Sequence, residues 1–134
     1  MRARTVAIVA GLVGGIGWMG KIAVMAAQGG PDEDSLVEAL AFFAGLGGVV
    51  IAAAAFGAYI GRRDSVGRRV VYAVGAVVAV AVIVGLGQAG LSALPGDSWV
   101  REEAVFGIAG LVAFVAAIVL MRSRPETEGP PPEM

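Results

Sequence analysis

Four polar side chains stand out in this sequence, because each lies near the end of a long apolar stretch that otherwise offers no chemistry. They are one cation, two carboxylates and one amide: Lys21, Glu38, Gln88 and Glu103. If the apolar stretches are helices that alternate in direction, all four side chains fall at the same end of the assembly. The sequence therefore predicts an outer polar cluster, which would form a pocket for an ion or a small polar ligand.

Each member of this cluster also has a structural interpretation. Lys21 lies 15 residues after Val6, about 22 Å along a helix, where a lysine can extend its ammonium group to the edge of an apolar layer or form an ion pair. Glu38 is a candidate partner for Lys21, but Ser35 and Glu38 also have the S-x-x-E spacing of a capping box. Glu103 is favoured near a helix start by the helix dipole. We expect a structural role for Lys21 in preference to a transport role.

The residue types that are missing exclude most catalytic chemistry. The sequence contains no histidine and no cysteine, which removes histidine-held haem, most zinc sites, thiol redox centres and Ser–His or Cys–His catalysis. The acidic run 32–34 lacks the pattern of a calcium-binding EF-hand loop, and the glycines do not form a phosphate-binding loop. We therefore expect no enzymatic activity, no metal ion, no cofactor and no nucleic-acid partner.

The composition indicates where such a chain is found. Apolar residues make up 57% of the 134 residues, charged residues 16%, and the mean hydropathy is +0.81. Soluble domains carry about 25% charged residues, and a chain of this length buries only about two thirds of its surface. So much apolar surface cannot be hidden in a water-facing core, and the expected partner is a lipid bilayer.

Charged residues divide the chain into four apolar stretches. Three runs are free of charge, 39–60, 70–96 and 104–121, and a fourth, 6–27, is interrupted only by Lys21. Each is apolar all round, as in helices that contact lipid, and about 20 helical residues cross a hydrocarbon core. The sequence predicts an all-α integral membrane four-helix bundle, one domain over residues 1–124, with spans at about 6–27, 38–61, 70–91 and 102–121. The proline-rich residues 125–134 are predicted to be a disordered cytoplasmic tail.

Arginines predict the orientation of the four spans. Lys and Arg concentrate in cytoplasmic segments, and Arg101 and Lys21 alone fall on the other side. We predict a bacterial plasma (inner) membrane with both termini in the cytoplasm. A cleaved signal peptide is the alternative for the first stretch, which is longer than the usual apolar region of about 7–15 residues. The eight arginines on the predicted cytoplasmic side are Arg2, Arg4, Arg62, Arg63, Arg68, Arg69, Arg122 and Arg124.

The two halves of the chain show a faint internal similarity. Thirteen positions between 4 and 57 carry the residue that is found 65 positions later, among them Glu38 (Glu103) and Gly45 (Gly110). One interpretation is a duplicated helical hairpin, with repeat units at 4–61 and 69–122, in which both copies run in the same direction through the membrane. The other interpretation is chance similarity between stretches rich in Ala, Val and Gly.

Small residues recur at a spacing of four along the predicted spans. Such ridges allow helix backbones to approach closely in lipid. The glycines that we predict at helix–helix contacts are Gly11, Gly15, Gly48, Gly57, Gly61 and Gly85.

These patterns favour a non-enzymatic role. We expect an accessory or scaffold subunit that acts through helix–helix packing, either by self-association or with another membrane protein. The alternative is an oligomeric channel or transporter for an ion or small solute, with the outer polar cluster as its mouth. A transport pathway normally carries polar groups near the membrane midplane, and this sequence has almost none there.

Overall fold

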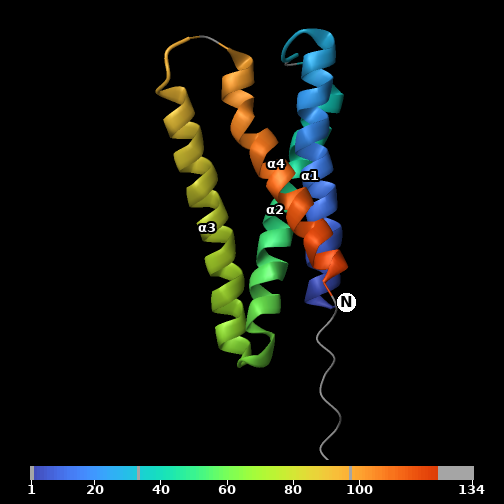
Figure 1. Ribbon diagram of the computed structural model, residues 1–134, viewed down its shortest axis with the longest axis vertical. Helices are drawn as coiled ribbons and strands as arrows, with labels where there is room; N and C mark the ends of the chain where they lie inside the picture. The colour runs from blue at the N-terminus through green and yellow to red at the C-terminus, as the bar shows by residue number, and fades with distance from the viewer. Residues whose placement is uncertain (1, 33, 97, 124–134) are drawn as a thin grey trace, which may run out of the picture.

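Four long helices make up the computed structural model, which describes residues 2–32, 34–96 and 98–123 (Figure 1). The predicted tail at 125–134 lies outside the described residues. Each helix is long enough and apolar enough to cross a membrane, so the prediction of four such helices is confirmed. The elements are α1 (Ala3–Gln28), α2 (Leu36–Ile60), the short 3₁₀ helix η1 (Gly61–Arg63), α3 (Val66–Ser92) and α4 (Trp99–Arg122).

Local sequence accounts for where the helices begin and end. α1 stops at Gly29, whose φ of 86° is left-handed, a conformation that glycine adopts without strain. The Gly30 N–H then donates to the Met25 carbonyl at 2.8 Å. At the start of α2, the hydroxyl of Ser35 accepts from the Glu38 N–H at 3.3 Å, which satisfies one of the free amides of the first turn. Ser65 caps α3 in the same way.

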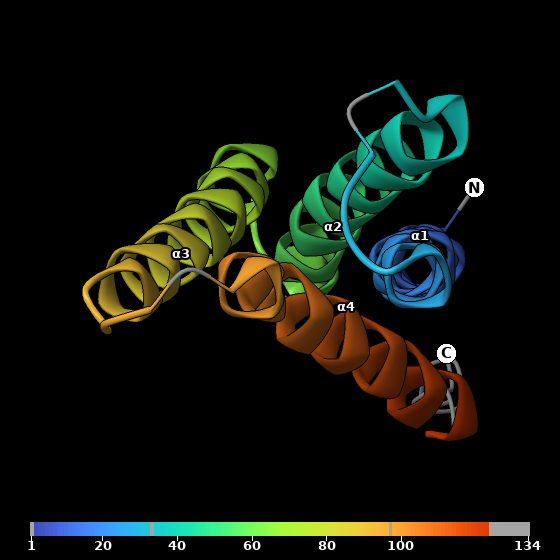
Figure 2. The same cartoon turned by 90° about the horizontal axis from the view of Figure 1, so that it is seen from above.

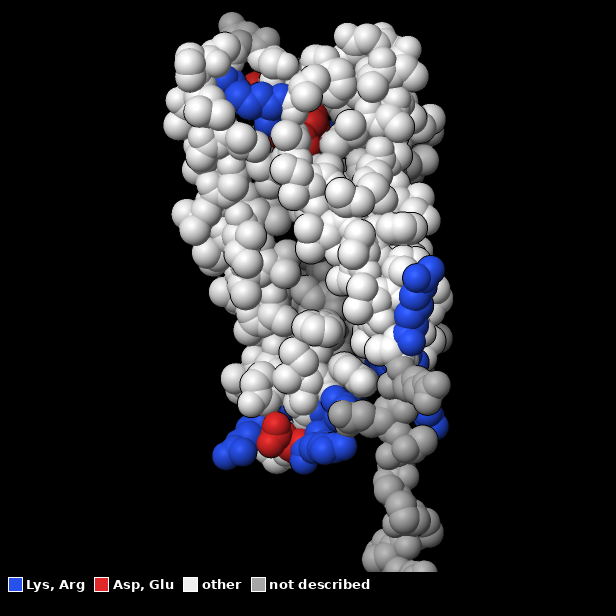
Figure 3. Space-filling model, viewed as in Figure 1, with Lys and Arg blue, Asp and Glu red and all other residues white. Residues whose placement is uncertain are grey.

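The helices alternate in direction, so the connections fall at two ends of the molecule (Figure 1). The start of α1, the η1 turn and the end of α4 share one end, which we call the arginine end. The loops 29–35 and 93–98 share the other, which we call the loop end. Figure 3 shows most Lys and Arg side chains at the arginine end, with one lying higher on the surface between the two ends, and a smaller group of basic and acidic side chains at the loop end.

Burial is distributed unevenly among the four helices. α1 packs against both α2 and α4, which contact each other only slightly. α3 stands to one side, contacts mainly α2 and contributes no buried residue (Figure 2). α3 meets α2 near the arginine end, where a Cβ atom at Gly57 would lie 2.8 Å from the Cα of Ala73. The buried apolar side chains of the core are Ala7, Trp18, Met25, Val49, Ala55, Val105 and Ala117.

Candidate functional site

An ion pair joins α1 to α4 near the loop end. The ammonium of Lys21 lies 2.8 Å from Oε2 of Glu103, and the two side chains are only 13% and 18% exposed. The same ammonium lies 5.1 Å from the ring centroid of Phe42 on α2, within the range of a cation–π contact. Lys21 is thus held between a carboxylate and an aromatic face, which is the structural ion pair that the sequence allowed.

Aromatic rings pack directly beside this pair. Trp18 is 2% exposed, and its indole N–H donates to the Phe42 carbonyl at 3.2 Å. The Phe106 ring makes edge-to-face contacts with both, at centroid distances of 5.2 Å from Trp18 and 5.6 Å from Phe42. Rings in such edge-to-face pairs attract each other beyond their simple burial. Together with the ion pair, the Trp18 cluster (Trp18, Phe42 and Phe106) links α1, α2 and α4.

Glycines make room for Trp18, and sequence reasoning missed them. A side chain at Gly45 would overlap the indole ring, and a Cβ atom at Gly110 would lie 3.0 Å from the Trp18 Cβ. Gly45 and Gly110 occupy matching positions, 65 residues apart, in the two halves of the chain. The sequence did contain a large aromatic residue and two glycines that could accommodate it. Their contact depends on how the helices cross, which the sequence alone does not indicate.

Glu38 belongs to a different network, which closes the loop between α1 and α2. It is 6% exposed, and its carboxylate accepts the Asp32 N–H at 3.1 and 3.3 Å and the side-chain amide of Gln28. Its own N–H donates to Ser35, so one half of the predicted capping box is present. Glu103, and not Glu38, is the ion-pair partner of Lys21.

Gln88 is the fourth residue of the predicted outer polar cluster, and it lies on α3. Its carbonyl oxygen Oε1 is buried and has no hydrogen-bond partner among the described residues. The structure therefore brings Lys21 and Glu103 together, places Glu38 in the loop network and leaves Gln88 apart from both.

Most of the predicted contact glycines face another helix. A Cβ atom at Gly15 would lie 2.6 Å from the Gly110 carbonyl oxygen, and one at Gly48 would lie 2.5 Å from the Gly14 Cα. Gly11, Gly57 and Gly61 are similarly close to neighbouring helices. Gly85 differs, because nothing lies within 4 Å of its Cβ position.

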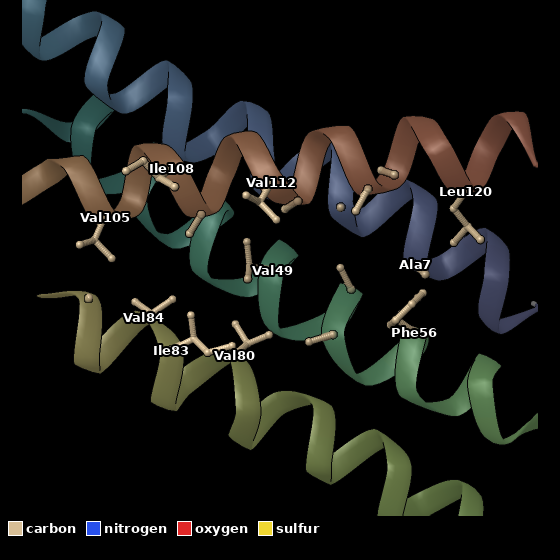
Figure 4. A pocket seen from close by; sticks show the side chains of 18 of the residues that line it. Ala7, Val49, Phe56, Val80, Ile83, Val84, Val105, Ile108, Val112 and Leu120 are labelled. Carbon is tan, nitrogen blue, oxygen red and sulfur yellow. The ribbon is translucent and has the colours of Figure 1, made fainter.

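An apolar cleft separates α3 from α4, and α2 and α1 form its floor (Figure 4). Its volume is about 540 Å³. Every lining residue is Ala, Gly, Val, Ile, Leu or Phe. The cleft extends from Val105 and Leu91 toward the loop end to Phe56 and Leu120 toward the arginine end. No hydrophobic pattern in one helix could have predicted it, because it results from the separation of two helices.

No metal site is present in the part of the chain that the structure describes, since no three acidic side chains converge there. Comparisons with protein-family models, with curated proteins and with solved structures gave no match.

Proposed function

We propose that this chain is a four-span plasma-membrane protein of a bacterium, a non-enzymatic accessory or scaffold subunit that acts through helix–helix contacts. The observation that carries the proposal is α3. None of its 27 residues is buried, although its most apolar 18-residue window has a mean hydropathy of 2.6. Water cannot cover so much apolar surface at low cost, so lipid and partner helices are the fitting surroundings.

The distribution of charge supports an orientation with both termini in the cytoplasm. The arginine end carries the arginines of the α1 start, the η1 turn and the α4 end (Figure 3). At the loop end, Arg101 is the only described arginine. Lys and Arg remain on the cytoplasmic side of membrane proteins, so we place the arginine end there.

α3 also offers a surface for a partner helix. Ala81, Gly85 and Ala89 follow one another at a spacing of four and are all exposed. Equivalent ridges on α1 and α2 are already occupied, as the contact between Gly14 and Gly48 illustrates. Small residues let helices pack closely in lipid, where van der Waals contact replaces the hydrophobic drive. The partner is a second copy of this chain or a helix of another membrane protein.

The two hairpins run in the same direction from the arginine end (Figure 1). Any four helices of alternating direction do so, and the support for a duplicated hairpin is the thirteen matching positions. The alternative function, an oligomeric channel or transporter, receives less support. The described residues that line the cleft are all apolar, whereas an ion or solute pathway needs polar groups at that depth.

The absence of native cysteines allows a direct test of topology. Single cysteines replace Ser98 at the loop end or Ser123 at the arginine end, and intact cells are treated with a membrane-impermeant maleimide. We expect labelling of Ser98→Cys in intact cells and of Ser123→Cys only after permeabilisation. Labelling of Ser123→Cys in intact cells would reverse the orientation, and recovery of the protein from the aqueous fraction would refute membrane insertion.

Cysteine crosslinking also tests the partner surface. Ala89→Cys on the α3 ridge is oxidised in the membrane, with Val115→Cys on α4 as a matched control that is exposed but off the ridge. We expect a crosslinked product from the ridge position alone, and adding Gly85→Leu should abolish it. Equal crosslinking at both positions would show random collision and contradict the proposed docking surface.

A further inference from the structure

We propose that the cleft between α3 and α4 binds one acyl chain of an anionic phospholipid, with the lipid phosphate at Arg101. The inference rests on the membrane insertion proposed above. It concerns a different surface from the α3 ridge, because the cleft is lined by the α3 face that carries Val80, Val84 and Gly87. A partner helix and a lipid chain can therefore be tested separately.

The dimensions of the cleft select a lipid chain over a helix. From Val105 to Leu120, α4 rises about 22 Å at about 1.5 Å per residue. A volume of about 540 Å³ spread over that length gives a mean cross-section of about 25 Å². An α-helix with side chains is about 10–12 Å wide and needs roughly 80–110 Å². A single file of carbon atoms, with contacts at about 3.5–4.0 Å, needs far less.

Polar groups lie at both ends of the cleft. At the arginine end, Arg4 donates to the carbonyls of Leu120 and Ser123, and its Nε is buried without a partner among the described residues. The loop end carries two polar side chains, Gln88 and Arg101. Gln88 stands four residues after Val84, on the same face of α3, and its Oε1 is buried without a partner among the described residues. Arg101 stands four residues before Val105 on α4, and its Nε is buried and equally without a partner. Residues four apart on a helix share a face, so both groups belong to the loop end of the cleft.

Arg101 is the group at this end that is complementary to a phosphate, although the exposed carboxylate of Glu102 follows it directly in the chain. Arg101 donates from Nη1 to the Leu94 carbonyl, and no described carboxylate forms an ion pair with it. The neighbouring Glu103 is already paired with Lys21. Guanidinium groups bind phosphate through two parallel hydrogen bonds. The Arg101 Nε and the Gln88 oxygen are both buried, so these side chains must shift to contact the phosphate and a glycerol hydroxyl of the head group.

Lipid titration followed by native mass spectrometry tests the proposal. The full chain is purified in mild detergent and titrated with phosphatidylglycerol or phosphatidylcholine, both with chains of equal length. We expect one retained lipid per protomer and a preference of about tenfold for phosphatidylglycerol, because the choline cation of phosphatidylcholine cancels the charge of the phosphate beside Arg101. Both lipids carry a phosphate, so equal binding of the two would overturn the selection of an anionic head group.

Two glycines of α3 provide a test variant and a control for the binding of the lipid acyl chain in the cleft. A Cβ atom at Gly87 would lie 3.6 Å from the Val105 side chain, inside the cleft, whereas one at Gly75 meets nothing within 4 Å. We expect Gly87→Leu to weaken the binding of both lipids and Gly75→Leu to leave it unchanged. Equal effects of the two substitutions would refute an acyl chain in the cleft.

Substitutions of Arg101 separate charge from fold. Arg101→Gln should remove the preference for phosphatidylglycerol, and Arg101→Lys should retain most of it, with unchanged helix content by circular dichroism. If Arg101→Lys loses the preference as completely as Arg101→Gln, the positive charge at residue 101 does not select the anionic lipid, and the assignment of its head group to Arg101 is wrong. Failure of membrane insertion would be recognised independently by the topology experiment.

Discussion

The two hairpins of this chain differ in how closely their helices approach. In the α1–α2 hairpin, backbone meets backbone: a Cβ atom at Gly14 would lie 2.6 Å from the nitrogen of Val49, and one at Gly17 would lie 2.6 Å from the nitrogen of Gly45. In the α3–α4 hairpin the helices diverge and leave a cleft of about 540 Å³. Both hairpins are strongly apolar, so hydropathy does not explain the difference.

The difference in helix spacing is explained by comparing positions that lie 65 residues apart in the two hairpins. Close contact between helix backbones requires residues without bulky side chains on both helices. The first hairpin has glycines at several positions where the second has larger residues, and the buried Trp18 and half-buried Lys21 of the first are also replaced. The second hairpin carries Ala79 for Gly14, Val82 for Gly17, Ala113 for Gly48, Ile83 for Trp18 and Leu86 for Lys21.

The largest effect is expected at the glycine contact of the first hairpin. Gly48→Leu forces a side chain against the Gly14 backbone, where a Cβ atom would already lie 2.5 Å from the Cα. Helices cannot separate there without losing their packing, so we expect the free energy of unfolding to fall by about 3 kcal/mol. Reversible unfolding in mixed detergent micelles, followed by circular dichroism, measures this change.

Gly47 is the control for that experiment, since nothing lies within 4 Å of its Cβ position. Gly47→Leu adds the same side chain to the same helix and should leave the stability unchanged or raise it by up to about 1 kcal/mol, because glycine is a poor helix former. Similar losses from both substitutions would show that the close glycine contact does not distinguish the hairpins.

The next effect is expected at the ion pair that fixes α4 to the first hairpin. Lys21→Met leaves the carboxylate of Glu103 without its partner in a site where both side chains are less than one fifth exposed. We expect a loss of about 2 kcal/mol, below the roughly 3–5 kcal/mol of fully buried pairs. Adding Glu103→Gln should recover most of it. A double-mutant cycle measures the coupling, and simple additivity of the two losses would contradict the ion pair.

The smallest effect is expected at the turn between the hairpins. Arg68 and Asp64 also form an ion pair, at 3.6 Å, but the Arg68 side chain is 75% exposed. Exposed pairs contribute little because water and salt screen them. We expect Asp64→Asn to change the stability by less than about 0.5 kcal/mol in the same unfolding assay. A loss as large as that of Lys21→Met would mean that burial does not determine how much these ion pairs contribute to the free energy of unfolding.

Much of the fold was predictable because the relevant signals are local. Apolar length and the positions of arginines locate four helices, and Gly29 and Ser35 mark where α1 ends and α2 begins. The candidate site was predictable only in part. The four polar residues were identified, but their distribution between the ion pair, the loop network and α3 depends on which helix faces which.

Trp18 illustrates the limit of local reasoning. Its position toward the end of an apolar stretch is typical of a ring at a membrane interface, yet it is 2% exposed and packs between helices. Only the glycines that face it, Gly45 and Gly110, create that space. They are 27 and 92 residues away along the chain, so no window of sequence contains the contact.

The sequence by itself determined that this chain forms four apolar helices with arginines at one end, because hydropathy, charge and capping act within one helix or turn. The tertiary structure decided the partner of Lys21, the burial of Trp18 and the opening of a cleft beside α3. Those features depend on the rotation and crossing of helices, which arise from the sum of many small contacts between distant residues. The same glycine can therefore lie at a tight crossing, as Gly48 does, or face open surroundings, as Gly85 does.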